Sequence, residues 1–196
     1  DELIQNATAS NKNKPHPLLD EFYYFQAIIY LRSNLLNQAE ITAKKLIDQY
    51  PNSPLKKNAL YMLAYIAWKR PHPQYRTIAG YLNQLRIDLK TSPEKALLAM
   101  LVADSYYLNG DYKNANDAYA LAMRELSQQA YTQELGRLLY QRVTSEIQLG
   151  QLEQAQAHLD EYANKINDPF NRWRAEWNLL NKMRESNQKD QAIERI

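Results

Sequence analysis

The side chains of this chain that are best suited to chemistry are aromatic. Tyr61, Tyr65 and Trp68 follow one another at spacings of four and three residues, which places them on one face of a helix. Rigid aromatic side chains bury a large area at low entropic cost, so such a face can hold a partner by non-covalent contact. The alternative is that these rings pack between helices, as most aromatic side chains on helix faces do.

Residues suited to metal binding or catalysis do not form a matching set. His16, His72 and His158 are scattered, and no two share the four-residue spacing of a zinc helix. The adjacent carboxylates Asp20-Glu21 and Asp160-Glu161 point to different sides of a helix. Cysteine is absent. We therefore expect no catalytic residue, no metal and no cofactor, and a protein that is not an enzyme.

Composition excludes several other classes. Four glycines in 196 residues are too few for phosphate-binding loops or long sheets, and a net charge of +2 without a basic stripe argues against a nucleic-acid partner. No apolar run approaches the roughly 20 residues that span a bilayer, so we expect no membrane insertion. The chain begins at Asp1 without a signal-peptide pattern, and we expect it to be a processed or excised piece of a longer protein.

An internal repeat indicates the elements that position these residues. Five alanines recur at spacings of 40, 36, 40 and 37 residues, which is typical of stacked helical hairpins: Ala39, Ala79, Ala115, Ala155 and Ala192. A small side chain lets helix axes approach to about 8–10 Å. A second row consists of Ala27, Ala64 and Ala103, replaced by Val143 and Leu180 in the last two units, where we expect looser packing.

The pattern predicts a polar segment at residues 1–17 and an all-α region at 18–196. Its hairpins span about 18–51, 54–91, 93–128 and 133–167, with a partial fifth at 170–196. Asn34, Gly110 and Gly150 are expected to interrupt helices. Ser53 before Pro54 is expected to cap the helix that follows.

These residues resemble the tetratricopeptide repeat (TPR). The stretch from Ala99 to Ala122 matches the family's small residue, tyrosine, turn glycine, alanine, aromatic and alanine in order. The period is longer than the family's usual 34 residues. Residues 46–54 and 59–64 are also similar to repeats of bacterial envelope proteins, which implies an envelope or periplasmic location, with the cytoplasm as the alternative.

The resemblance implies a right-handed superhelical α-solenoid whose first helices line a concave groove for a protein or peptide partner. By helical phase the groove-facing residues are Tyr24, Ile28, Tyr61, Tyr65, Trp68, Met100, Asp104, Tyr107, Tyr140, Thr144 and Trp177. Asp104 would either receive a basic side chain of the bound peptide or bind a neighbouring hydroxyl such as that of Ser105 or Tyr107.

A second aromatic cluster lies near the C-terminus, where Arg172 and Arg174 alternate with Trp173 and Trp177. We expect these tryptophans to pack on the fourth hairpin. The alternative is a cation–π stack or a platform for a glycan.

The sequence thus predicts a non-catalytic protein-interaction scaffold, part of a larger bacterial envelope protein. Two alternatives remain open: a domain that binds glycans or small ligands, and the helical scaffold of a larger enzyme. The unfinished last hairpin leaves Ile193 and Ile196 uncovered, so self-association through this end is a further possibility.

Overall fold

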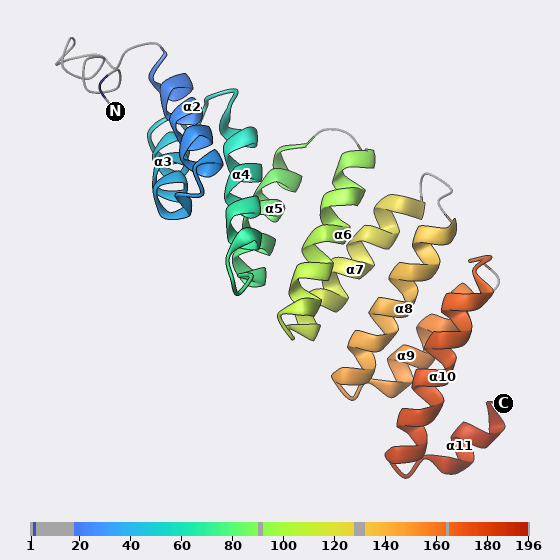
Figure 1. Ribbon diagram of the computed structural model, residues 1–196. Coiled ribbons are helices and arrows are strands. Elements are labelled where there is room, and N and C mark those ends of the chain that lie inside the picture. Colours follow the sequence, from blue (N-terminus) through green and yellow to red (C-terminus); the bar gives the residue numbers. More distant parts are fainter. Residues whose placement is uncertain (1, 3–17, 90–91, 128–131, 164, 196) are drawn as a thin grey trace. The chain divides into compact units, whose positions relative to one another are not determined.

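The computed structural model (Figure 1) describes Glu2 and residues 18–89, 92–127, 132–163 and 165–195. Over this part of the chain all regular structure is helical, in ten helices from α2 to α11. The predicted all-α architecture of paired helices is therefore confirmed. The predicted polar segment at residues 1–17 lies outside the described residues, apart from Glu2. The chain divides into two compact units, Asp1–Leu85 and Arg86–Ile196.

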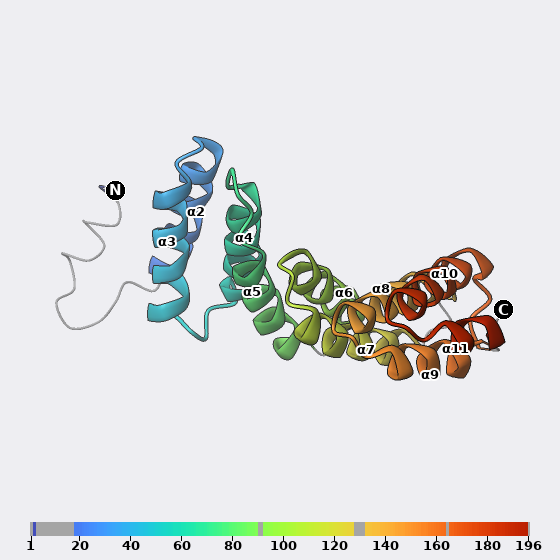
Figure 2. The same cartoon turned by 90° about the horizontal axis from the view of Figure 1, so that it is seen from below.

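The first unit contains α2 (Leu19–Arg32), α3 (Leu36–Gln49), α4 (Lys56–Lys69) and most of α5 (Tyr75–Asp88). Helices α2 and α3 lie side by side in both views, and α3 also packs on α4 (Figures 1 and 2). Two core clusters are found among its described residues. One combines Ala27, Ala39, Ala43, Met62, Leu63 and Ile66, and the other combines Leu19, Tyr23, Leu46 and Ala59. Alanines at the α2–α3 contact allow the two helices to approach closely.

The second unit contains α6 (Ser92–Leu108), α7 (Tyr112–Ser127), α8 (Thr132–Gln148), α9 (Leu152–Tyr162), α10 (Pro169–Glu185) and α11 (Lys189–Glu194). Helix α7 packs on both α6 and α8, and α8 packs on both α9 and α10. One continuous apolar core joins all six helices, with Tyr119, Leu138 and Leu179 fully buried in it. The unit therefore has the nearest-neighbour packing of a repeat array.

Both predicted rows of small residues lie in the helix contacts. The alanines of the first row, Ala39, Ala79, Ala115, Ala155 and Ala192, are all buried. In the second row Ala27, Ala64, Ala103 and Val143 are buried, whereas Leu180 is only partly buried. The expected loosening is thus absent at Val143 and begins at Leu180.

Four hairpin turns share one backbone geometry. The turn residues Asn34, Gly110, Gly150 and Asn187 all have positive φ, between 58° and 75°. In each turn the next N–H bonds to a carbonyl five residues earlier, at 2.8–3.0 Å: Leu35 to Tyr30, Asp111 to Tyr106, Gln151 to Glu146 and Gln188 to Met183. This is the Schellman arrangement, which favours glycine or asparagine at the left-handed position. The four turn residues therefore give the hairpins a common register.

The predicted cap at Ser53 is corrected by the structure. Helix α4 begins at Lys56 with Leu55 as its N-cap residue, and no side chain caps it. The Ser53 hydroxyl instead accepts from the Leu55 N–H at 3.1 Å and donates to Asp20 at 2.6 Å. Ser53 thus ties the start of α2 to the loop before α4, a contact between residues distant in sequence that helix-start rules do not include.

Candidate functional site

Helix α4 carries the most exposed group of the predicted aromatic residues. Tyr61, Tyr65 and Trp68 have relative exposures of 49%, 45% and 58%. The rings of Tyr65 and Trp68 lie 5.8 Å apart, centroid to centroid. We call these three residues the α4 aromatic face. The opposite side of α4, with Leu60, Leu63 and Ala67, is buried, so the face is held on a rigid element with much of its apolar surface in solvent.

Tyr24 on α2 lies differently. It is partly buried against both core clusters of the first unit, and its ring meets the edge of Phe25 at a centroid distance of 5.7 Å. Phe25 and Ile29 are the more exposed residues of α2, and sequence reasoning did not single them out. Their four-residue spacing, offset from Tyr23 and Ala27, is the pattern that could have identified an apolar outer face.

A polar pair joins α3 to α4 in the same unit. Arg70, at the end of α4, binds Glu40 and also donates to the Asn37 side chain at 3.2 Å. Glu40 accepts a further bond from Lys44 at 2.7 Å. The bonds from Lys44 and then Arg70 lower the pKa of the Glu40 carboxyl against the opposing effect of burial. These charges therefore hold the second hairpin against the first.

In the second unit, Met100 and Tyr107 on α6 are partly buried against the core. Tyr107 makes edge contacts with the rings of Tyr112 and Tyr119 at 5.5 and 6.5 Å. Burial raises the pKa of the Tyr107 hydroxyl. Met100 and Tyr107 therefore pack against the core, and only the exposed part of each side chain is available to a binding partner.

Asp104 is bound by two groups that sequence reasoning did not name. It accepts from the hydroxyl of buried Tyr119 at 2.7 Å and from Arg137 of α8 at 3.3 Å. The predicted bond to Ser105 or Tyr107 is not formed: Ser105 donates to the Leu101 carbonyl instead. A serine within a helix readily bonds back to the preceding turn, and the larger reach of Tyr119 and Arg137 brings them to Asp104 from other helices.

Tyr140 on α8 is covered by a cation. The Arg174 guanidinium of α10 lies 4.1 Å from the centre of the Tyr140 ring and 5.4 Å from that of Phe170. A cation–π contact is thus present in this cluster, with tyrosine and phenylalanine as its rings. Thr144, the next candidate along the helix, is buried and donates to the Tyr140 carbonyl at 2.8 Å.

Trp173 and Trp177 do not pack on the preceding hairpin, contrary to expectation. They stack on each other with ring centroids 5.9 Å apart and an interplanar angle of 15°. Their relative exposures are 62% and 54%. The side of α10 that packs inward carries Ala175, Leu179 and Met183, so the two indoles lie on the outer side of this helix.

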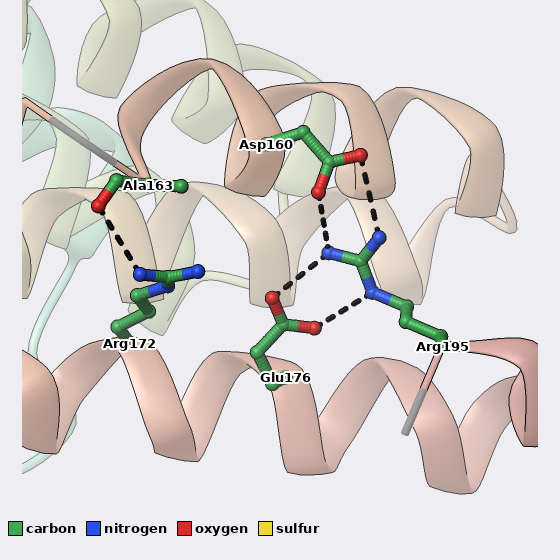
Figure 3. Close-up of polar contacts among 5 residues, drawn as sticks. All are labelled: Asp160, Ala163, Arg172, Glu176 and Arg195. Atoms are coloured by element: carbon green, nitrogen blue, oxygen red, sulfur yellow. Dashed lines mark hydrogen bonds and ion pairs between the residues drawn. The ribbon is translucent and has the colours of Figure 1, made fainter.

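Figure 3 shows the ionic cluster that joins α9, α10 and α11. Arg195 donates to Glu176 at 2.7 and 2.8 Å and to Asp160 at 2.9 and 3.3 Å. Burial opposes the charge on Arg195, but its bonds to Glu176 and Asp160 outweigh this and raise its pKa. Arg172 donates to the Ala163 carbonyl at 3.1 Å. The cluster fixes the short α11 and closes on itself, so we regard it as structural.

A second polar group lies inside the unit. Glu146 of α8 is fully buried, with its Oε1 atom 2.8 Å from His158 Nδ1 and 3.4 Å from Arg142 Nε. Arg142 also donates to Asn116 at 3.1 Å and lies 2.8 Å from His158 Nε2. Among the described residues neither oxygen of the Glu146 carboxylate forms a hydrogen bond, so these contacts are ion-pair distances only. The group links α7, α8 and α9. Among the described residues no cluster of histidine, aspartate and glutamate could hold a metal ion.

Comparison with known proteins supports the fold more than the function. No protein-family model matches the chain. The TPR-like repeats of a kinesin light chain from Podosopora anserina superpose with a TM-score of 0.54 and 14% identity, covering 92% of this chain and 93% of that one. A single-substitution variant of the same protein gives the same TM-score over 93% of each chain. The chain therefore has a TPR-like repeat fold.

One curated protein is also similar in sequence. The chain is 27% identical over 144 residues to a subunit of eukaryotic translation initiation factor 3 from Lodderomyces elongisporus. The match covers 72% of this chain but only 18% of that protein. Within the described residues, none of the helices is long and apolar enough to cross a membrane.

Proposed function

We propose that this protein is a non-catalytic scaffold that binds a segment of a protein partner, with the α4 aromatic face as its main contact. TPR-like repeat folds generally serve as protein-interaction scaffolds, and their members are typically non-catalytic. The observation that carries the proposal is the exposure of Tyr61, Tyr65 and Trp68 on a helix whose other side is buried. Covering these rings would release water from a preorganised apolar surface.

The other candidate residues have smaller parts in this proposal. Tyr24 contributes the outer edge of a partly buried ring in the first unit. In the second unit the residues would offer the surface that their internal contacts leave free: Met100, Asp104, Tyr107, Tyr140 and Trp177. Asp104 and Tyr140 are already in contact with Arg137 and Arg174. A bound protein would therefore gain less binding free energy from them than from the α4 aromatic face.

The test is capture of a partner by the wild-type chain and by the triple variant Tyr61→Ala/Tyr65→Ala/Trp68→Ala. The matched control is Ile41→Ala, which removes an exposed apolar side chain of the same unit on α3. Circular dichroism first establishes that all proteins are folded. A captured protein, once identified and purified, should bind the triple variant at least about tenfold more weakly and the control equally. Equal binding by the triple variant would contradict the proposal.

Glycan binding is the second candidate, because the paired rings of Tyr65 and Trp68 could also hold a sugar. Tryptophan emission that responds to oligosaccharides, and is unresponsive to the partner segment, would favour it. A role as the helical part of a larger enzyme is a further alternative, which the sequence of the complete parent protein would decide.

The location is a separate proposal. The similarity of residues 46–54 and 59–64 to repeats of bacterial envelope proteins supports an envelope or periplasmic protein, and a cytoplasmic one is the alternative. Fractionation of cells that produce the complete protein would distinguish the two: recovery with the cytosolic fraction alone would contradict the envelope proposal.

A further inference from the structure

The α4 aromatic face lies on a helix that carries no acidic residue. Helix α4 contains Lys56, Lys57 and Lys69 but neither aspartate nor glutamate. The other first helices of the hairpins, α2, α6, α8 and α10, each contain two acidic residues. Helix α4 is also interior to the chain, since α2 and α3 precede it and most of α5 follows it in the same unit. Its positive charge is therefore a property of this repeat and does not depend on where the chain begins or ends.

Two of the lysines flank the aromatic rings at opposite ends of the face. Lys57 lies one turn before Tyr61, and Lys69 lies one turn after Tyr65. Both lysines are exposed, and neither forms an ion pair with a described residue. Arg70, the next cation along the chain, is by contrast already paired with a carboxylate of α3. The apolar surface is therefore bounded at each end by a positive charge that is available to a binding partner.

The spacing of the two lysines limits which ligand can meet both of them. Lys69 follows Lys57 by twelve residues, which at 1.5 Å per residue corresponds to about 18 Å along the helix. An extended peptide covers this distance with about five or six residues. The exposed rings between the lysines are uncharged. A segment with a carboxylate toward each end and apolar side chains between them therefore matches the surface in both charge and length.

A single-stranded nucleic acid fits this surface less well. Bases can stack on tyrosine and tryptophan rings, but every nucleotide also brings a phosphate, which binds best beside a cation. The middle of the α4 aromatic face consists of uncharged rings, so phosphates placed there would lose water without gaining a cation. A peptide can carry its charges at the two ends alone. The charge pattern thus favours a peptide over a polynucleotide.

We infer that the α4 aromatic face and its flanking lysines bind an extended, acidic segment of another protein, with carboxylates at Lys57 and Lys69 and apolar side chains on the three rings. The inference rests on the proposed function and deepens it by stating the chemistry of the partner. The rings supply most of the affinity, because they bury apolar surface. The lysines supply selectivity, because exposed ion pairs contribute modestly to affinity but penalise a ligand of the wrong charge.

The experiment presents the full chain to a library of random decapeptides displayed on phage, with counter-selection against the triple variant Tyr61→Ala/Tyr65→Ala/Trp68→Ala. The counter-selection removes peptides that bind elsewhere on the protein. We expect the remaining sequences to carry aspartate or glutamate on both sides of apolar residues. Selected peptides are then synthesised with a fluorescein label and titrated with the protein, and fluorescence anisotropy gives the dissociation constant.

Substitution of the lysines tests the charge directly. The variant Lys57→Gln/Lys69→Gln should bind a selected peptide about fivefold more weakly. The matched control, Lys45→Gln/Lys113→Gln, removes two exposed lysines elsewhere, with the same change in net charge, and should bind like the wild type. The variant Lys57→Glu/Lys69→Glu should prefer the same peptide with its acidic residues replaced by lysine. Circular dichroism establishes that every variant is folded.

The possible failures separate this inference from the proposed function. Selected peptides that are neutral or basic but require the three rings would overturn the inference and leave the scaffold function intact. Equal binding by Lys57→Gln/Lys69→Gln and the wild type would have the same consequence. If no peptide requires the rings, both proposals fail.

The test also includes the other occupants of this surface. A single-stranded RNA oligonucleotide or an oligosaccharide that displaces the selected peptide at lower concentration than the unlabelled peptide does would overturn the inference. Self-association in sedimentation that disappears in the triple variant would make a second copy of the chain the occupant, and would also overturn it.

Discussion

The two units place candidate residues of the same predicted helical phase in different situations. On α4, Tyr65 contacts only the ring of Trp68 on its own helix among the aromatic contacts of the described residues, and both stay about half exposed. On α6 and α8, Asp104 and Tyr140 receive the guanidinium groups of Arg137 and Arg174.

The difference shows that helical phase assigns a residue to a side of its helix but does not determine whether it is available to a partner. In the second unit the first helix of the next hairpin supplies an arginine that reaches back over this side. The aromatic and acidic residues there therefore contribute first to cohesion between repeats. In the first unit the aromatic residues of α4 stay accessible, and we propose that they contribute to binding.

The strongest test of the repeat contacts is Ala115→Trp in the second unit. Ala115 is fully buried where α6 and α7 pack, and a larger side chain would force the helices apart. We expect a loss of about 1–3 kcal/mol in the free energy of unfolding. Thermal unfolding followed by circular dichroism measures it. The control is Ala157→Trp at an exposed position of α9; equal melting temperatures for the two variants would refute the assigned repeat contacts.

A smaller effect is expected from Tyr119→Phe, which removes the hydroxyl that donates to Asp104 at 2.7 Å. A bond to a charged acceptor contributes about 1.5–3 kcal/mol, and the lower end applies because Asp104 keeps Arg137. Urea unfolding near pH 8 measures the loss. The control is Tyr112→Phe, whose ring is partly buried beside Tyr107 and whose change should cost less.

The stability that the Tyr119 hydroxyl contributes should also depend on pH. Burial, followed by the nearby Asp104 carboxylate, raises the pKa of Tyr119 above its ordinary value. The folded state therefore holds this proton more tightly than the unfolded state, so the stabilisation is complete below about pH 10 and is lost as the pH rises beyond it. Between pH 8 and pH 11 the free energy of unfolding should fall more for the wild type than for Tyr119→Phe. An equal loss in both would contradict this assignment.

The smallest expected effect comes from Arg174→Gln, which would make the second unit resemble the first by uncovering Tyr140. We expect a loss of about 0.5–1 kcal/mol. A double-mutant cycle with Tyr140→Leu isolates the pair, and the exposed Arg184→Gln on the same helix serves as the control. If the losses from Arg174→Gln and Tyr140→Leu simply add, the two side chains do not interact in solution.

Much of the fold follows from local patterns. The alanine spacing predicted the paired helices because close helix contacts admit only small side chains, and those alanines are buried. Asn34, Gly110 and Gly150 were identified as interruptions, and all three adopt the positive φ of the hairpin turns. Asn187 adopts the same conformation and was not identified from the sequence.

The candidate site was less predictable. The exposure of Tyr61, Tyr65 and Trp68 follows from their position beside a leucine and alanine face, which is a property of one helix. The partners of Asp104 were not predicted because Tyr119 and Arg137 lie 15 and 33 residues away in the chain. A single sequence does not show which residues so far apart in the chain meet in space. The sequence therefore led to the expectation of a bond to a neighbouring residue such as Ser105.

The sequence by itself determined the helices, their pairing and the side on which each aromatic residue lies, because these depend on periodicity and on interactions within a few residues. Only the tertiary structure decided which of those residues are covered. That depends on how far a side chain such as Arg174 reaches across to the neighbouring helix. It also left Trp173 and Trp177 stacked on each other and more than half exposed, since the side of α10 that packs inward carries Ala175, Leu179 and Met183.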